Sequence, residues 1–480
     1  TSERNGCLIS SRLTGLAMGD PESSDVIVYS DIEALNITLG DGVDTFTVTS
    51  TDADTTIDGG AGNDHFTVTS TDADTTIDGG AGNDHFTVAA NLGDIVGTLT
   101  LLGGVDELAT LSIAPTVTSK LTLDSKEAGT MGVLKGDPMP GQIEFAQFPS
   151  VEFNLSDSDD VFTIQNTSTD VVLNAGDGGD HIEVINVSHA TAINLGAGLD
   201  DVTVFDSYAP LTVIGDKTSV QSMTVDRSAI TAAINVSIED GANPNSGLLK
   251  NLTNFDINFS GLAQVTIELG QNNDELTLDT ALVDTELELK GNQGNDRFLI
   301  RGIGDITIVS GGDNEDTLTA VITGPPTSDQ FTKLNLDVET LIGDNAESAE
   351  ATAWTLSTGG LSAETIPGGK TVDVISTDGV DLTRILGGTA SDTLEIVSGS
   401  GNVDGTIDGN TVVLREGLTV LEPAGFATYK NYETVVSFDG LTDDVTFYQE
   451  DDFIFTNAAG DGLALDNSTS PAISITNSLT

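Results

Sequence analysis

The sequence predicts an all-β chain folded as an elongated parallel β-solenoid, and three observations lead to that prediction. Residues 49–68 and 69–88 carry the same twenty-residue stretch, TSTDADTTIDGGAGNDHFTV, twice in succession without one change. The chain of 480 residues holds 53 glycines and only 5% aromatic residues, and it sustains no apolar pattern of helical period. Repeats of this length bury their apolar faces on one another, which gives a repeat protein its core.

The twenty-residue unit divides into two short strands and two turns. Residues 55–58 alternate apolar and polar side chains and are rich in β-branched residues, which indicates a strand. Residues 59–64 (GGAGND) indicate a tight loop that uses positive φ, residues 65–68 a second strand, and residues 49–54 a polar turn. A strand this short is not stable alone. We therefore expect the apolar residues to point inward and to stack on their copies in the next coil: Ile57 on Ile77, Phe66 on Phe86 and Val68 on Val88.

Degenerate copies of the loop extend the pattern along the chain. Spacings of 20 or 22 residues hold within each cluster of copies, and a longer period of 116 residues relates Asp64, Asp180 and Asp296. Less regular stretches separate the clusters and predict additional strands. The sequence therefore predicts β-solenoid modules at 1–115, 116–230 and 231–325, a degenerate module at 326–400 and a terminal degenerate β module at 401–480.

The formal net charge of −60, from 16 basic and 76 acidic residues, is the strongest compositional signal. So few basic residues exclude nucleic acid as a partner. Stacked coils lie roughly 4.8 Å apart, so equivalent aspartates form ladders of like charge. Each adjacent pair repels by about 1 kcal/mol in water and by more near protein. A hard divalent cation such as Ca²⁺, which binds carboxylates and backbone carbonyls, is the expected counterion. A halophilic surface is the competing explanation, although these acids occupy fixed loop positions.

Residues 59–66 and 79–86 both read G-G-x-G-x-D-x-U, where U is a large apolar residue. In this motif the chain resembles the RTX, or haemolysin-type, calcium-binding repeat family. The resemblance implies that the motif aspartates and loop carbonyls of stacked coils hold calcium between them. RTX coils carry two such loops in about eighteen residues, whereas this coil carries one. We therefore expect ions mainly along one edge, with a weaker second ladder formed by Asp52, Asp54, Asp72 and Asp74.

The candidate calcium ligands are the glycines and aspartates that match the motif, together with the aspartates of its degenerate copies. They are Asp44, Gly60, Gly62, Asp64, Gly80, Gly82, Asp84, Asp160, Asp177, Asp180, Asp200, Asp274, Asp296 and Asp316.

Other polar residues invite separate interpretations. His65 and His85 occupy equivalent outward positions, which is compatible with a zinc ladder, although inheritance with the repeat is the simpler explanation. Arg297 and Arg301 stand out in so acidic a chain, and we interpret them as a salt-bridged pair beside Asp296. The sequence contains no apolar run long enough to insert into a bilayer.

Three functions are compatible with this pattern. The first is a non-enzymatic extracellular structural protein, a calcium-stiffened rod that assembles with itself, end to end, into a filament, hair or surface layer. Both ends of the sequence read as ready to continue into further modules or another copy. The second is the stalk of a calcium-dependent cell-surface adhesin, with glycans as partners. The third is a calcium-dependent polysaccharide lyase or epimerase, for which Arg297 and Arg301 are the candidate bases.

The calcium hypothesis makes a prediction about stability. Binding to a site that the unfolded chain lacks contributes folding free energy, so chelation should lower the melting temperature sharply. Asp64→Ala and Asp84→Ala should each weaken the fold locally. Thermal unfolding followed by circular dichroism checks this, and equal melting temperatures in excess chelator and in millimolar calcium would contradict it.

Overall fold

The computed structural model confirms an all-β chain, a β-solenoid of about 13 turns built of stacked parallel coils, with 1% helix. The structure describes residues 3–16 and 26–321, apart from short gaps at 90, 105–107, 127–128, 218, 244–245, 280–281, 283 and 302–306, and separate stretches between 334 and 475. In these residues the one helix is a 3₁₀ turn, η1 (Leu92–Asp94). None of the described helices has the length and apolar character needed to cross a membrane.

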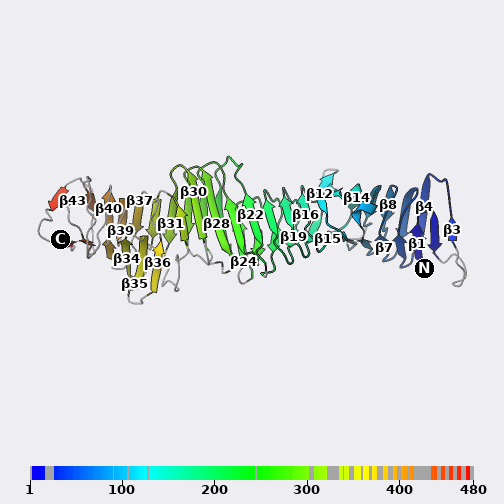
Figure 1. Ribbon diagram of the computed structural model, residues 1–480, viewed down its shortest axis with the longest axis horizontal. Helices are drawn as coiled ribbons and strands as arrows, with labels where there is room; N and C mark the ends of the chain where they lie inside the picture. Colours follow the sequence, from blue (N-terminus) through cyan, green and yellow to red (C-terminus); the bar gives the residue numbers. More distant parts are fainter. Residues whose placement is uncertain are drawn as a thin grey trace. The chain divides into compact units, whose positions relative to one another are not determined.

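The chain divides into two compact units. Unit 1 comprises Thr1–Val225 and Thr253–Gln264, and unit 2 comprises Asp226–Leu252 and Val265–Thr480. Within each unit the strands of successive coils lie side by side in sheets (Figure 1).

The coils of unit 1 place their strands in two sheets. The first sheet contains, in spatial order, β3 (Val26–Val28), β2 (Arg12–Gly15), β1 (Asn5–Ile9), β5 (Thr45–Val48), β7 (His65–Val68), β9 (His85–Val88), β11 (Thr110–Ile113), β15 (Ser150–Asn154), β17 (Asp170–Asn174), β19 (Thr191–Asn194), β21 (Leu211–Ile214) and β25 (Ile257–Ser260). The second contains β4 (Ala34–Gly40), β6 (Asp54–Gly60), β8 (Thr75–Asp78), β10 (Thr98–Leu102), β14 (Met139–Ala146), β13 (Met131–Asp137), β12 (Lys120–Lys126), β16 (Val161–Ile164), β18 (His181–Val184), β20 (Asp201–Val204) and β22 (Ser222–Asp226). All neighbours are parallel except in β1–β2–β3 and β12–β13–β14.

Unit 2 repeats the arrangement and adds a third group of strands. One sheet contains β23 (Asn235–Asp240), β24 (Ser246–Lys250), β27 (Glu275–Leu278), β29 (Arg297–Ile300), β31 (Thr317–Val321), β33 (Thr340–Asp344), β37 (Leu382–Leu386), β39 (Asn402–Ile407), β40 (Asn410–Arg415), β41 (Thr434–Asp439), β43 (Phe453–Asn457) and β44 (Gly462–Leu465). A second contains β26 (Gln264–Glu268), β28 (Glu286–Gln293), β30 (Thr307–Asp313) and β32 (Leu334–Asp337). A third contains β36 (Lys370–Ile375), β35 (Gly360–Ile366), β34 (Ala351–Ser357), β38 (Thr393–Ile396), β42 (Val445–Tyr448) and β45 (Ala472–Ile475).

The register confirms the inward stacking expected from the repeat. Parallel pairing places Ile57 opposite Ile77, and Phe66 opposite Phe86. The two phenyl rings stack with centroids 4.9 Å apart, and each side chain is 1% exposed. Identical coils therefore build the core from columns of identical side chains, one column for each inward position.

Three inserted strands alter the path of the chain in unit 1. Strands β12, β13 and β14 all lie in the second sheet, where each pairs antiparallel with the next. Along the chain they come between β11 and β15, two strands of the first sheet that pair directly with each other. Before this insertion, the loops that end in the motif aspartate lead into strands of the first sheet, β7 and β9. After it, the equivalent loops lead into strands of the second sheet, β16, β18 and β20. The edge that carries the aspartates thus changes sides within unit 1.

Shortening one buried side chain within such a column should destabilise the fold strongly. Because Phe66 is buried against Phe86, Phe66→Ala should reduce the unfolding free energy by about 3–5 kcal/mol. The matched control is Thr67→Ala, a half-exposed neighbour on the outer face of the same strand, which should cost about 0.5 kcal/mol. Denaturant unfolding measures both variants, and equal losses would contradict the assigned inward face.

Candidate functional site

The motif aspartates lie inside the coils rather than on their surface. All nine of them are between 0% and 2% exposed, and each immediately precedes the strand that its loop leads into. They form three sets that we call ladder 1 (Asp44, Asp64, Asp84), ladder 2 (Asp160, Asp180, Asp200) and ladder 3 (Asp274, Asp296, Asp316).

Within each ladder, one hydrogen bond connects each aspartate to the next. The backbone N–H of Asp44 donates to Oδ1 of Asp64 at 2.7 Å, and that of Asp64 donates to Oδ1 of Asp84 at 2.8 Å. The same bond recurs at 2.8 and 2.9 Å in ladder 2 and at 2.7 and 2.8 Å in ladder 3. The aspartate side chain therefore accepts the peptide N–H of the preceding coil at the corner where the chain turns into a strand.

Two residues without the motif close the ends of ladder 2. The hydroxyl of Ser119 donates to Oδ1 of Asp160 at 2.8 Å, while Ser156, in the loop that leads to Asp160, donates its hydroxyl to Oδ2 at the same distance. At the other end of ladder 2, Nε2 of Gln221 donates to Oδ2 of Asp200 at 2.6 Å. Sequence reasoning missed the role of these three residues. The one available signal was the spacing of Gln221, which lies 21 positions after Asp200, where the next motif aspartate would be expected.

The motif glycines are explained by the same corner. A Cβ atom on Gly59 would lie 2.7 Å from Oδ2 of Asp64, so the carboxylate folds over a position that only glycine leaves open. Gly60 has φ +91°, and a Cβ there would lie 2.1 Å from the carbonyl oxygen of Gly40 in the preceding coil. The G-G-x-G-x-D pattern is thus the requirement of a tight corner that stacks directly on its neighbour.

Burial and like charge raise the pKa of the central aspartate in each ladder. Desolvation is the largest cause, and hydrogen bonds from the preceding coil oppose it only in part. The pKa is raised to about 6 for Asp64, to about 7 for Asp180 and to about 7 for Asp296. Burial also raises the pKa of Asp200 and Asp274. The central carboxyl groups therefore carry a proton for part of the time at neutral pH.

The remaining predicted ligands lie outside the ladders. Asp177 is exposed in its loop, and the four aspartates of the expected second ladder are all exposed: Asp52, Asp54, Asp72 and Asp74. Gly60, Gly62, Gly80 and Gly82 adopt positive φ at the corner of ladder 1. The structure thus brings the nine motif aspartates into lines, while it leaves the other aspartates apart from them.

The fit of these residues to calcium can be judged from their oxygen atoms. Oδ2 of Asp64, Asp180 and Asp296 is buried and accepts no hydrogen bond from the described residues. Calcium takes six to eight oxygen ligands, whereas no group of three or more His, Cys, Asp or Glu side chains in the described part of the chain is arranged to hold a metal ion. Each of these three carboxylates thus leaves one oxygen without a hydrogen bond from the described residues. Calcium binding stays a prediction.

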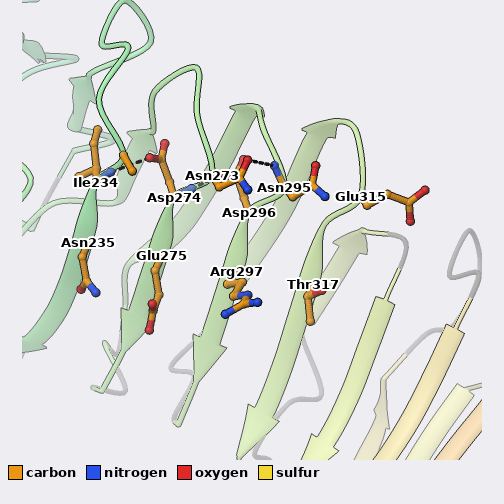
Figure 2. Close-up of a pocket in the computed structure, with 11 residues that line it drawn as sticks. Ile234, Asn235, Asn273, Asp274, Glu275, Asn295, Asp296, Arg297, Glu315 and Thr317 are labelled. Atoms are coloured by element: carbon orange, nitrogen blue, oxygen red, sulfur yellow. Dashed lines mark hydrogen bonds between the residues drawn. The ribbon is translucent and has the colours of Figure 1, made fainter.

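A cavity of about 620 Å³ lies over ladder 3 in unit 2. Figure 2 shows Asn273, Asn295 and Glu315 at the loop positions before the buried aspartates, while Glu275, Arg297 and Thr317 follow them on the strands. Parallel register puts Arg297 between Glu275 and Thr317. The side chains that border the cavity therefore include one arginine, two glutamates and three asparagine amides. Arg301 lies apart and forms an ion pair with Asp279 at 3.0 Å, rather than with Asp296.

Comparison of the chain with known protein families and with curated protein sequences finds no match.

Asp64 offers a test that separates charge from hydrogen bonding. Asp64→Asn keeps an oxygen that can accept the N–H of Asp44 and removes the buried charge, so its stability at pH 8 should match or exceed that of the parent. Asp64→Ala leaves that N–H without its acceptor and should lose about 1–3 kcal/mol. Denaturant unfolding in chelator distinguishes the two, and an equal loss in both variants would contradict the ladder.

The raised pKa values predict an unusual pH dependence. An aspartate titrates near 3.9 when unfolded, whereas Asp64, Asp180 and Asp296 titrate at about 6 to 7 in the folded chain. The folded state therefore binds protons more tightly, and the stability from these groups is present below about pH 4 and is lost as the pH rises towards 7. The melting temperature in chelator should increase from pH 8 to pH 5. A decrease over that range would contradict the assignment.

Proposed function

We propose that this chain is a structural repeat protein whose stacked coils act as a rod or spacer outside the cell. The proposal rests on the structural role of the motif aspartate, which is the most regularly repeated polar residue of the chain. Each motif aspartate is buried and hydrogen-bonded to a neighbouring coil, so the repetition serves the stack itself. A repeated binding surface would instead need those side chains to reach solvent.

Assembly with itself is the second part of the proposal. Each coil presents to the next a set of backbone groups and apolar columns, and a further copy could extend the stack in the same way. Lateral contact between chains of formal charge −60 meets strong repulsion, which calcium or another divalent cation would relieve. We therefore propose end-to-end filaments, with divalent cations between neighbouring filaments.

The cavity over ladder 3 favours the second candidate function, a cell-surface stalk that also binds glycans. Arg297 and the amides of Asn273 and Asn295 provide hydrogen-bond donors of the kind that sugar hydroxyl and carboxylate groups accept. A lyase or epimerase would need one basic residue to remove a proton. Arg297 borders the cavity beside Glu275, while Arg301 forms an ion pair with Asp279. Because an arginine side chain stays protonated in proteins, Arg297 is suited to binding a ligand rather than to removing a proton.

Electron microscopy of the purified chain tests the proposal directly. At high concentration, filaments should form in millimolar calcium, should separate laterally in chelator, and should keep their end-to-end continuity. Negative-stain images together with sedimentation velocity report both levels of assembly. Monomers at every concentration, with and without calcium, would refute self-assembly and leave a monomeric spacer.

A further inference from the structure

A row of side chains on the outer face of unit 1 contains two imidazoles side by side. Parallel register aligns Thr45, His65, His85 and Thr110 on strands β5, β7, β9 and β11 of the first sheet. All four side chains are exposed. Each of these residues directly follows the corner position of its coil, so the stack that orders the buried aspartates also fixes the spacing of the two histidines.

The two rings lie at the separation that one metal ion requires. Their centroids are 5.6 Å apart and their planes are inclined by 62°. With zinc–nitrogen bonds of about 2.0–2.1 Å, two imidazoles that share one ion have centroids roughly 5–6 Å apart. The stacked strands therefore hold both rings close to the separation for chelation, and only side-chain rotation is needed to direct a nitrogen from each ring at a common point.

A hydrogen bond to Thr110 positions the second ring. Nδ1 of His85 lies 2.5 Å from the hydroxyl oxygen of Thr110, while Nε2 lies 3.4 Å from the hydroxyl of Thr87, a long contact. When Nδ1–H donates to Thr110, the lone pair of Nε2 is available to a metal ion. Histidines that bind metals are oriented in this way, by a hydrogen bond from the nitrogen that does not coordinate.

We propose that His65 and His85 together bind one divalent transition-metal ion of the Zn²⁺ type, with water in the remaining coordination positions. Imidazole nitrogen suits zinc, copper and nickel, whereas calcium and magnesium prefer oxygen. The formal charge of −60 raises the concentration of any divalent cation at the surface, so charge attracts the ion and the imidazoles select it. This site is independent of the proposed structural role.

The full-length chain, freed of metal by chelator and dialysed at pH 7.5, tests the proposal with Zn²⁺ alone. Isothermal titration should show one zinc equivalent that is lost, or weakened at least tenfold, in both His65→Gln and His85→Gln. His181→Gln is the matched control, because His181 holds the equivalent position in the next cluster of coils but pairs with the carboxylate of Asp201 at 2.5 Å. The control should keep the zinc equivalent.

Two further measurements make the outcome decisive. Circular dichroism should show that the variants fold, since both histidines are exposed and substitution leaves the core intact. Calcium titration should give the same isotherm for the parent and the variants, because oxygen ligands are unchanged. Zinc binding that survives in both single variants, or falls equally in His181→Gln, would overturn the proposal.

Discussion

The hydrogen bond from a peptide N–H to the aspartate of the next coil is the constraint on which the coil corners depend. At a corner the backbone turns away from its neighbour, and the regular parallel ladder cannot supply an acceptor for every N–H. Asp64 shows how the chain solves this, because its N–H donates to the carboxylate of Asp84 while its own carbonyl accepts the N–H of His85. Side chain and backbone thus continue one hydrogen-bond network through the turn.

This solution places acidic groups where they are costly to ionise, and the three central carboxyl groups therefore add less than their formal charge to the folded chain. A formal charge of −60 assumes that every carboxyl group is ionised. The central carboxyl groups, with pKa values of about 6 to 7, share protons with the solvent at neutral pH and lower the charge that the folded stack carries. Protonation of these buried carboxyl groups therefore relieves part of the repulsion between stacked aspartates. From the sequence alone, a bound metal ion was expected to neutralise that repulsion.

The fold could be predicted well from the repeat, because the alternation of apolar and polar residues lies within one short coil and recurs unchanged in the next coil. The positions of Ile57, Phe66 and Val68 follow from alternation within one coil, and the stacking of each on its copy follows from the period. The ladders of aspartates followed from the period as well, but the burial of their side chains did not. A GGxGxD loop reads as a surface ligand set, and only the three-dimensional corner shows that Gly59 makes room for the carboxylate of Asp64 to fold inward. The ladder ends at Ser119 and Gln221 were equally hidden. Gln221 follows Asp200 by 21 positions but is no aspartate, and Ser119 precedes Asp160 by 41 positions, outside the spacing of the motif.

The inserted strands β12, β13 and β14 have a consequence for what unit 1 can present to its surroundings. His65 and His181 are 116 residues apart and are counterparts in the longer period, yet His65 lies on the first sheet and His181 on the second. Counterparts in the longer period therefore lie on different sheets of unit 1. A partner that binds to one sheet of unit 1 contacts only one of the two copies. The two sheets can therefore diverge in sequence and in binding properties independently of each other.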